Sequence, residues 1–200
     1  MTAPALFDVV PAATTAAGPR PRIIGLDISL SSTGVCLPDG STYRIKTRDT
    51  DADYRLVVIR DHIRRALIRH QPLHLAVLED LPVGAKSAGL TGMAQGVVRA
   101  ELADAGVPRA LISPATLKCF ACDYGKADKR RMADAAYLAA GAAFPGDLTP
   151  KGHGGDMCDA WWLRAAGHDW WGDPLFTLPD AQRARLAKGK WPVGLPRWVR

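Results

Sequence analysis

The sequence of 200 residues predicts an α/β protein with one mixed β-sheet that is covered by helices. Three short strands come first, and a Pro38-Asp39-Gly40 turn, typical of a β-hairpin, separates the second from the third. Helices and two further buried strands then alternate, and such crossover connections place strands parallel in one sheet. The length suits one domain with some tail to spare.

The first strand contains a charge that a purely structural strand would not need. Between Arg22 and Ile28 the apolar residues favour a buried strand, yet Asp27 lies within this run. Removing an unpaired carboxylate from water is costly. The small polar residues of 29–34 form a turn that lets another group approach the backbone closely. We interpret Asp27 as a metal ligand.

The hairpin and the first helix come next. Strands are predicted over Thr33–Leu37 and Thr42–Lys46, and a polar link covers 49–53. From Tyr54 to Arg69 apolar residues recur at helical spacing, which predicts an amphipathic helix. We interpret the basic residues off its apolar stripe as a solvated face, namely Arg60, Arg64, Arg65 and Arg69.

A second buried strand ends in acid, as the first does. It spans 74–80 and contains Glu79. A helix rich in small residues follows over 88–105. Gly92 and Gly96 are four residues apart in this helix, which suggests close packing against the sheet or a partner chain.

The remaining elements complete the core. Ser113 and Pro114 are favoured residues for an N-cap and a first helical turn, so a helix begins there. The other predicted segments are, in order, a loop at 81–87, a strand at 108–112, a loop at 123–128, a helix at 129–143, a loop at 144–155 and a helix at 156–166.

The two ends of the chain differ from the core, 22–168, in composition. Residues 1–21 are rich in Ala, Thr and Pro and lack the basic start and apolar centre of a signal peptide, which predicts a disordered arm. The tail, 169–200, is basic and rich in Trp and Pro, and a short helix is predicted at 179–188. Its tryptophans either contact DNA by stacking or pack back on the domain.

The bulk composition sets limits on location and partners. No run approaches the roughly 18–20 apolar residues of a membrane span, so we expect a cytoplasmic protein without a membrane partner. A net charge of +6 permits an acidic polymer as partner. The four cysteines are expected to be reduced. Cys119, Cys122 and Cys158 could form a zinc site with His153, but the spacing of these residues is loose. The favoured explanation is that the cysteines are small buried side chains on helices.

The predicted sheet and the last core helix can bring four carboxylates together. Asp27 and Glu79 lie on strands that a crossover can place side by side, while Asp156 and Asp159 share one face of the last core helix. Singly, each acid has an ordinary structural explanation, but their joint order favours a site. Carboxylate oxygens at this density suit Mg²⁺ or Mn²⁺, and two such ions about 3.5–4 Å apart commonly promote attack on a phosphodiester.

Four short motifs occur in a characteristic order and on suitable elements. They are Ile24-Gly-Leu-Asp27 with the Ser31-Ser-Thr-Gly34 turn, Leu75-Ala-Val-Leu-Glu79, Leu90-Thr-Gly-Met-Ala-Gln-Gly96 and Asp156-Met-Cys-Asp159-Ala160. Through them, residues 22–168 resemble the RuvC family of Holliday-junction resolvases, within the ribonuclease H-like nuclease superfamily. A phage or prophage origin fits this resemblance as well as a bacterial one.

The resemblance implies a fold, a substrate and a site. The fold is ribonuclease H-like, with three antiparallel strands followed by two parallel ones. The substrate is a four-way junction or other branched DNA, nicked symmetrically on opposed strands by a homodimer. The site holds two Mg²⁺ (or Mn²⁺) ions, which Asp27 bridges, while Glu79, Asp156 and Asp159 complete their shells.

Basic residues near a helix start are expected to contact the DNA backbone. Lys118 and Lys129 stand where family members carry such lysines, and a helix N-terminus with basic side chains is a natural phosphate site. The further expected DNA contacts are Lys126, Arg130, Ser31 and Ser32. One departure is Pro82, which stands where family members often carry an aromatic residue, so junction opening and sequence preference are left open.

Three other functions compete with junction resolution. The same acids would serve another ribonuclease H-like nuclease that cuts RNA–DNA hybrid or branched DNA without specificity. Actin-like and sugar-kinase ATPases can share the Gly-x-Asp strand and its polar turn, but they need a second such domain. A non-catalytic DNA-binding module would not need the complete acid set.

Overall fold

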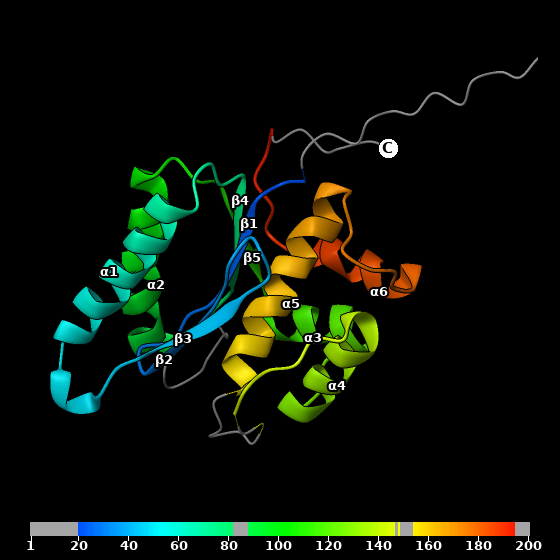
Figure 1. Ribbon diagram of the computed structural model, residues 1–200, viewed down its shortest axis with the longest axis horizontal. Helices are drawn as coiled ribbons and strands as arrows, with labels where there is room; N and C mark the ends of the chain where they lie inside the picture. Colours follow the sequence, from blue (N-terminus) through cyan, green and yellow to red (C-terminus); the bar gives the residue numbers. More distant parts are fainter. Residues whose placement is uncertain (1–19, 82–87, 147, 149–153, 195–200) are drawn as a thin grey trace, which may run out of the picture.

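One five-stranded mixed sheet forms the centre of the molecule. The computed structural model describes residues 20–81, 88–146, 148 and 154–194. The strand order is β3-β2-β1-β4-β5 (Figure 1), with β2 antiparallel to β1 and β3, and β4 parallel to β1 and β5. The strands are β1 (Ile23–Asp27), β2 (Ser32–Cys36), β3 (Thr42–Lys46), β4 (Leu75–Glu79) and β5 (Arg109–Ile112). This topology confirms the predicted mixed sheet.

Helices cover both faces of the sheet, as Figure 1 shows. On one face lie α1 (Tyr54–Arg69) and α2 (Ala88–Asp104). On the other face the long helix α5 (Gly154–Trp171) packs directly on the strands, with α3 (Pro114–Cys122) and α4 (Lys129–Ala140) beside it. The remaining helical segments are α6 (Asp180–Arg183) and the 3₁₀ turns η1 (Asp49–Asp51) and η2 (Ala184–Lys188). No helix in these described ranges is long and apolar enough to cross a membrane.

Alternation along the central strands builds two hydrophobic layers. In β1, Ile23 belongs to the layer with α5, whereas Ile24 and Leu26 belong to the layer with α1 and α2. In β4, Val77 joins the α5 layer and Leu78 the opposite one. Because side chains alternate between faces, Asp27 and Glu79 share the α5 face with Ile23 and Val77.

Helix α5 is longer than the sequence indicated. The prediction ended the helix at Ala166. In the structure Gly167 continues the helix, and a side chain there would lie 2.8 Å from Ile23 Cγ2 and Val77 Cγ2. The helix ends only before Gly172, whose φ is +90°. Gly167 therefore permits close contact with the sheet.

Two other predicted ends were wrong for local reasons. Helix α4 stops at Ala140, before the predicted end at 143, because Gly141 adopts the left-handed conformation that terminates helices. Asp27 is the last residue of β1, not a residue in its middle.

Of the predicted arm, 1–21, only Arg20 and Pro21 lie among the described residues, and the loop at 82–87 lies outside them.

The described part of the tail packs on the domain. Trp191 stacks on Trp170 with ring centroids 4.7 Å apart, and its indole nitrogen donates to the Leu186 carbonyl. Lys190 forms an antiparallel bridge with Leu111 at the edge of β5, with N–O distances of 2.8 and 3.0 Å. These contacts support the packing alternative for Trp170 and Trp191, and they cover a sheet edge that would otherwise be open.

Helix α2 contacts α1 through an ion pair that the sequence did not suggest. Arg64, predicted to be solvated, donates to both carboxylate oxygens of Glu101 at 2.7 and 2.8 Å. Of the two glycines of α2, Gly96 has no atom of the described chain within 4 Å of an added side chain, whereas Gly92 has Leu81 Cδ1 at 3.7 Å. Gly96 is exposed and does not serve packing against the sheet.

Candidate active site

Two parallel strands place the first pair of carboxylates. The register pairs Leu26 of β1 with Leu78 of β4, so the next residues, Asp27 and Glu79, end neighbouring strands at the same edge. The carboxyl ends of parallel strands are a common position for functional residues in α/β folds. The Glu79 carbonyl also accepts a hydrogen bond from the Gln95 side chain at 2.6 Å, which ties the end of β4 to α2.

The N-terminus of α5 brings the second pair to this edge. Gly34 of β2 pairs with Asp27, and a side chain at Gly34 would lie 2.0 Å from the Asp156 carbonyl oxygen. The backbone of the first turn of α5 therefore lies directly on β2. Asp156 lies in that turn and Asp159 follows three residues later on the same face of the helix. We call the four residues the acidic cluster: Asp27, Glu79, Asp156 and Asp159.

Asp156 is held by two donors. Its Oδ1 accepts from Lys129 Nζ at 2.6 Å, and its Oδ2 accepts from the Ser32 hydroxyl at 2.5 Å. The aliphatic part of Lys129 passes over Gly155, where a side chain would overlap it at 2.0 Å. Ser32 and Lys129, both expected to contact DNA, thus contact a carboxylate of the acidic cluster in this structure.

The carboxylates of the cluster repel one another in a poorly solvated recess. Burial, then Glu79 and Asp159, raise the pKa of Asp27 well above its usual value. Burial and Asp159 raise the pKa of Glu79 from 4.5 to about 8, and burial raises that of Asp159 from 3.8 to about 6. Burial lowers the pKa of Lys129, but the hydrogen bond to Asp156 and the other acids outweigh this effect and raise it.

This donor set fits a hard divalent cation. Carboxylate oxygens are the ligands that Mg²⁺ and Mn²⁺ prefer, and partly desolvated carboxylates gain most from a cation nearby. In the described ranges, however, no three His, Cys, Asp or Glu side chains are already arranged to hold a metal ion. Both oxygens of Asp156 are occupied by Lys129 and Ser32, so this residue would exchange a partner when an ion binds.

The raised pKa values predict that the metal-free protein loses stability as pH rises. The folded chain binds more protons than the unfolded chain between the ordinary carboxylate pKa and about 8, the raised pKa of Glu79. The buried carboxyl groups therefore stabilise the fold fully when the pH is below their ordinary pKa. This stabilisation is lost as the pH rises through their raised pKa in the folded chain. Between about pH 5 and about pH 8 we expect a loss on the order of 2 kcal/mol, allowing for solvent screening.

Thermal unfolding in EDTA, followed across this pH range, measures the loss. Excess Mg²⁺ should raise the melting temperature more at the alkaline end, where the carboxylates are ionised. Glu79→Gln should flatten the pH dependence in EDTA, because it removes one group with a strongly raised pKa. A metal-free protein whose stability rises over this interval would contradict the electrostatic description.

Basic residues border the acidic cluster on one side. Lys118 of α3 lowers the pKa of both Glu79 and Asp159, so its ammonium group lies near them. The side chains of Lys126 and Arg130 are exposed around the start of α4. Ser31 is also exposed, in the turn between β1 and β2.

Of the four free cysteines, Cys36 and Cys158 are buried, while Cys119 and Cys122 are half-buried. Cys158 is buried, and burial raises the pKa of its thiol well above the ordinary value. Burial likewise raises the pKa of Cys122 to about 11. In the metal-free protein such thiols are protonated at neutral pH. His153 lies outside the described residues.

Similar sequences are found among curated proteins, although no model of a known protein family matches the chain. A crossover junction endodeoxyribonuclease RuvC of Paraburkholderia phymatum is 33% identical over 120 residues, which are 56% of this chain and 67% of that protein. A protein of the same name from Azoarcus sp. is 33% identical over 120 residues, which are 56% of this chain and 66% of the relative.

Solved structures give the same fold. The Thermus thermophilus RuvC structure superposes with a TM-score of 0.60 at 19% identity, covering 86% of this chain and 99% of that one. The T. thermophilus RuvC in complex with Holliday junction substrate gives a TM-score of 0.61 at 18% identity, covering 86% and 100%. The likeness confirms the predicted ribonuclease H-like architecture.

Proposed function

Because the chain belongs to the RuvC family of crossover junction endodeoxyribonucleases, we propose that it is a metal-dependent endonuclease that resolves Holliday junctions by paired nicks. The observation that supports this function most is the convergence of four carboxylates at one sheet edge, bordered by lysines. Its DNA substrate would place the protein in the cytoplasm of a bacterial cell or a phage-infected host.

The acidic cluster would hold two Mg²⁺ or Mn²⁺ ions. Asp27 is the candidate for a shared ligand, because β1 lies between β4, which ends in Glu79, and β2, on which the first turn of α5 rests. The other three acids all raise its pKa. Bound there, the ions would supply a Lewis acid and an activated water for phosphodiester hydrolysis, leaving 5′-phosphate and 3′-hydroxyl ends.

The side chains around the cluster would position the DNA strand. Lys118 lies close enough to the acids to contact the phosphate that is cut, and its charge offsets part of their repulsion of DNA. Lys126 and Arg130 are exposed beside it and would contact neighbouring phosphates. Lys129 would hold Asp156 in place through their ion pair, measured at 2.6 Å.

A homodimer would be needed to nick two opposed strands. Helix α2 offers a candidate surface, because Leu90 and Met93 are 52% and 44% exposed. Analytical ultracentrifugation of Met93→Glu against the unchanged chain tests this surface.

Cleavage of defined DNA substrates tests the proposed function. A synthetic four-way junction, a linear duplex and an RNA–DNA hybrid are incubated with the protein and either Mg²⁺ or Mn²⁺. We expect paired nicks at symmetric positions of the junction and little cutting of the duplex. If the hybrid is cut and the junction is left intact, the protein is another kind of ribonuclease H-like nuclease.

Lys118→Ala should weaken junction binding and reduce its salt dependence. Loss of one phosphate contact lowers the slope of log K against log salt by about one. Fluorescence anisotropy in EDTA, measured at several salt concentrations, gives this slope without cleavage. Arg69→Ala is a suitable control, because Arg69 is exposed at the end of α1, a helix that packs on the face of the sheet opposite to α5. An unchanged slope for Lys118→Ala would remove this lysine from the DNA surface.

A further inference from the structure

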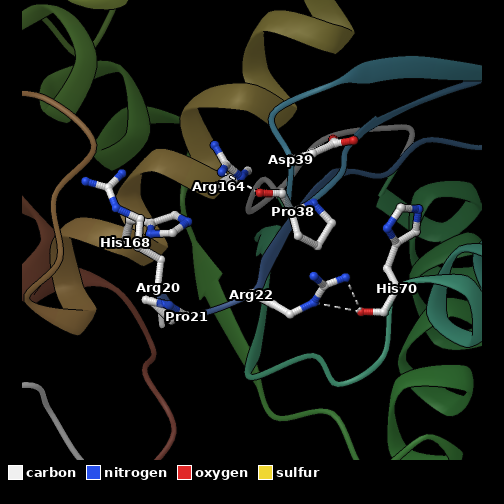
Figure 2. Close-up of a pocket in the computed structure, with 8 residues that line it drawn as sticks. All are labelled: Arg20, Pro21, Arg22, Pro38, Asp39, His70, Arg164 and His168. Atoms are coloured by element: carbon white, nitrogen blue, oxygen red, sulfur yellow. Dashed lines mark hydrogen bonds between the residues drawn. The ribbon is translucent and has the colours of Figure 1, made fainter. Parts of the chain in front are cut away.

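A cavity of about 380 Å³ lies at the opposite end of β1 from the acidic cluster (Figure 2). We call it the arginine cavity, because three arginines line it beside two histidines, two prolines and one aspartate. It is formed by the chain before β1, the β2–β3 hairpin, the end of α1 and the second half of α5. Arg164 on α5 is eight residues beyond Asp156, roughly 12 Å along the helix axis, so the cavity is separate from the candidate active site.

Arg164 is a buried cation with an unused donor. It is only 9% exposed, and although its Nη2 donates to the Pro38 carbonyl at 2.6 Å, its Nε has no partner in the described chain. Asp39 of the hairpin is turned toward Ser41, from which its Oδ1 accepts two hydrogen bonds at 2.9 and 2.7 Å. A buried guanidinium with an unsatisfied N–H is costly unless an acceptor joins it.

His168, one turn farther along α5, presents a second unsatisfied group. It is 1% exposed, and neither ring nitrogen makes a well-formed hydrogen bond with the described residues. Burial, then Arg164 and Arg20, lower its pKa to about 3, so the ring is neutral at physiological pH and offers one N–H donor. Its Nδ1 is 3.9 Å from Asp173 Oδ2, a carboxylate that also pairs with Arg20 at 3.5 Å.

Arg22 completes the basic wall from the start of β1. Its Nε and Nη2 donate to the His70 carbonyl at 3.3 and 3.1 Å, which fixes the guanidinium at the cavity (Figure 2). The prolines Pro21 and Pro38 provide apolar surface between the charged groups. The cavity thus combines cationic side chains from separate elements with apolar walls, which is typical of a site for a small anionic ligand with an organic part.

We propose that the arginine cavity binds the phosphate group of a small ligand, through Arg164 and Arg22 with Arg20 at the rim. A phosphate offers acceptor oxygens in several directions and so matches donors from separate elements, whereas a carboxylate offers acceptors in one plane. A volume of about 380 Å³ exceeds what a phosphate ion needs and leaves space for a sugar or base against the prolines.

Isothermal titration of the full chain with three probes tests this site. Inorganic phosphate and deoxyadenosine monophosphate should each bind saturably, and acetate should not. Arg164→Lys, which keeps the charge but removes the fork of donors, and Arg20→Gln should each weaken binding about tenfold. Arg65→Gln, at an exposed arginine of α1 outside the cavity, should bind like the unchanged chain.

The outcomes separate the sources of phosphate. Tighter binding of the mononucleotide than of inorganic phosphate identifies an organic phosphate ligand, and equal binding identifies the free ion. Absence of saturable binding by both phosphate probes overturns the proposal, as does equal affinity in Arg20→Gln and the unchanged chain. Arg20 is on the surface, with a side chain 61% exposed, so this variant decides the question even if Arg164→Lys does not fold.

Discussion

Asp27→Asn should abolish junction cleavage while leaving junction binding nearly intact. We expect a loss of at least about a thousandfold in the cleavage rate, because an amide cannot replace a carboxylate that would bind two ions. Asp27 has the central position in the acidic cluster, with Glu79, Asp159 and Asp156 all raising its pKa. Binding depends on basic residues that the substitution does not touch. Single-turnover cleavage and anisotropy titrations in EDTA measure the two effects separately.

A second carboxylate on the surface provides the control. Asp134→Asn removes the same charge from an exposed position on α4, and its cleavage rate should match that of the unchanged chain. Asp27→Asn should also raise the melting temperature in EDTA, because it relieves repulsion among buried acids. Cleavage by Asp27→Asn within tenfold of the control would refute the metal-site assignment.

Failure of the substrate test and failure of the metal site are distinguishable. The unchanged chain could cut an RNA–DNA hybrid but no junction, while Asp27→Asn cuts neither. That result would support the metal site at the acidic cluster and show that the substrate is not a junction. Binding at the arginine cavity is independent of both results, since its ligands come from the other half of α5 and from the start of β1.

The sequence was sufficient to predict the positions of the acids because strand ends follow simple rules. Two buried runs that carry Asp27 and Glu79 and are joined by a crossover place both acids at one edge when the strands are parallel neighbours. The prediction placed Asp27 within its strand, whereas the structure places it at the end. The hairpin turn and the N-cap at Ser113 were equally predictable, since local residue types determine them.

What the sequence did not reveal depends on contacts between distant segments. The bonds of Lys129 and Ser32 to Asp156 join residues 27 and 124 positions apart, and no periodicity reports them. Gly167 is a helix breaker in isolation, and only the packing of α5 on β1 and β4 explains its place in a helix. The arginine cavity likewise gathers residues from four separate segments, each with an ordinary local explanation.

Gly34→Ala should destabilise the fold and displace the acids together. A methyl group at this position would lie 2.0 Å from the Asp156 carbonyl oxygen and 2.5 Å from its carbon, which are backbone atoms that no side-chain rotation can move. We expect a loss of at least about 3 kcal/mol in the free energy of unfolding, together with loss of cleavage, because the first turn of α5 must move away from β2. Urea unfolding gives the stability change, and cleavage of the folded fraction gives the effect on the site.

Gly96→Ala is the matched control for this steric argument. Gly96 lies in helix α2 with open space around it, so the same added methyl group meets nothing, and alanine is the better helix former by about 1 kcal/mol. The free energy of unfolding should therefore rise for Gly96→Ala and fall for Gly34→Ala. Equal stability of the two variants would show that α5 does not lie directly on β2, and the geometry of the acidic cluster would need revision.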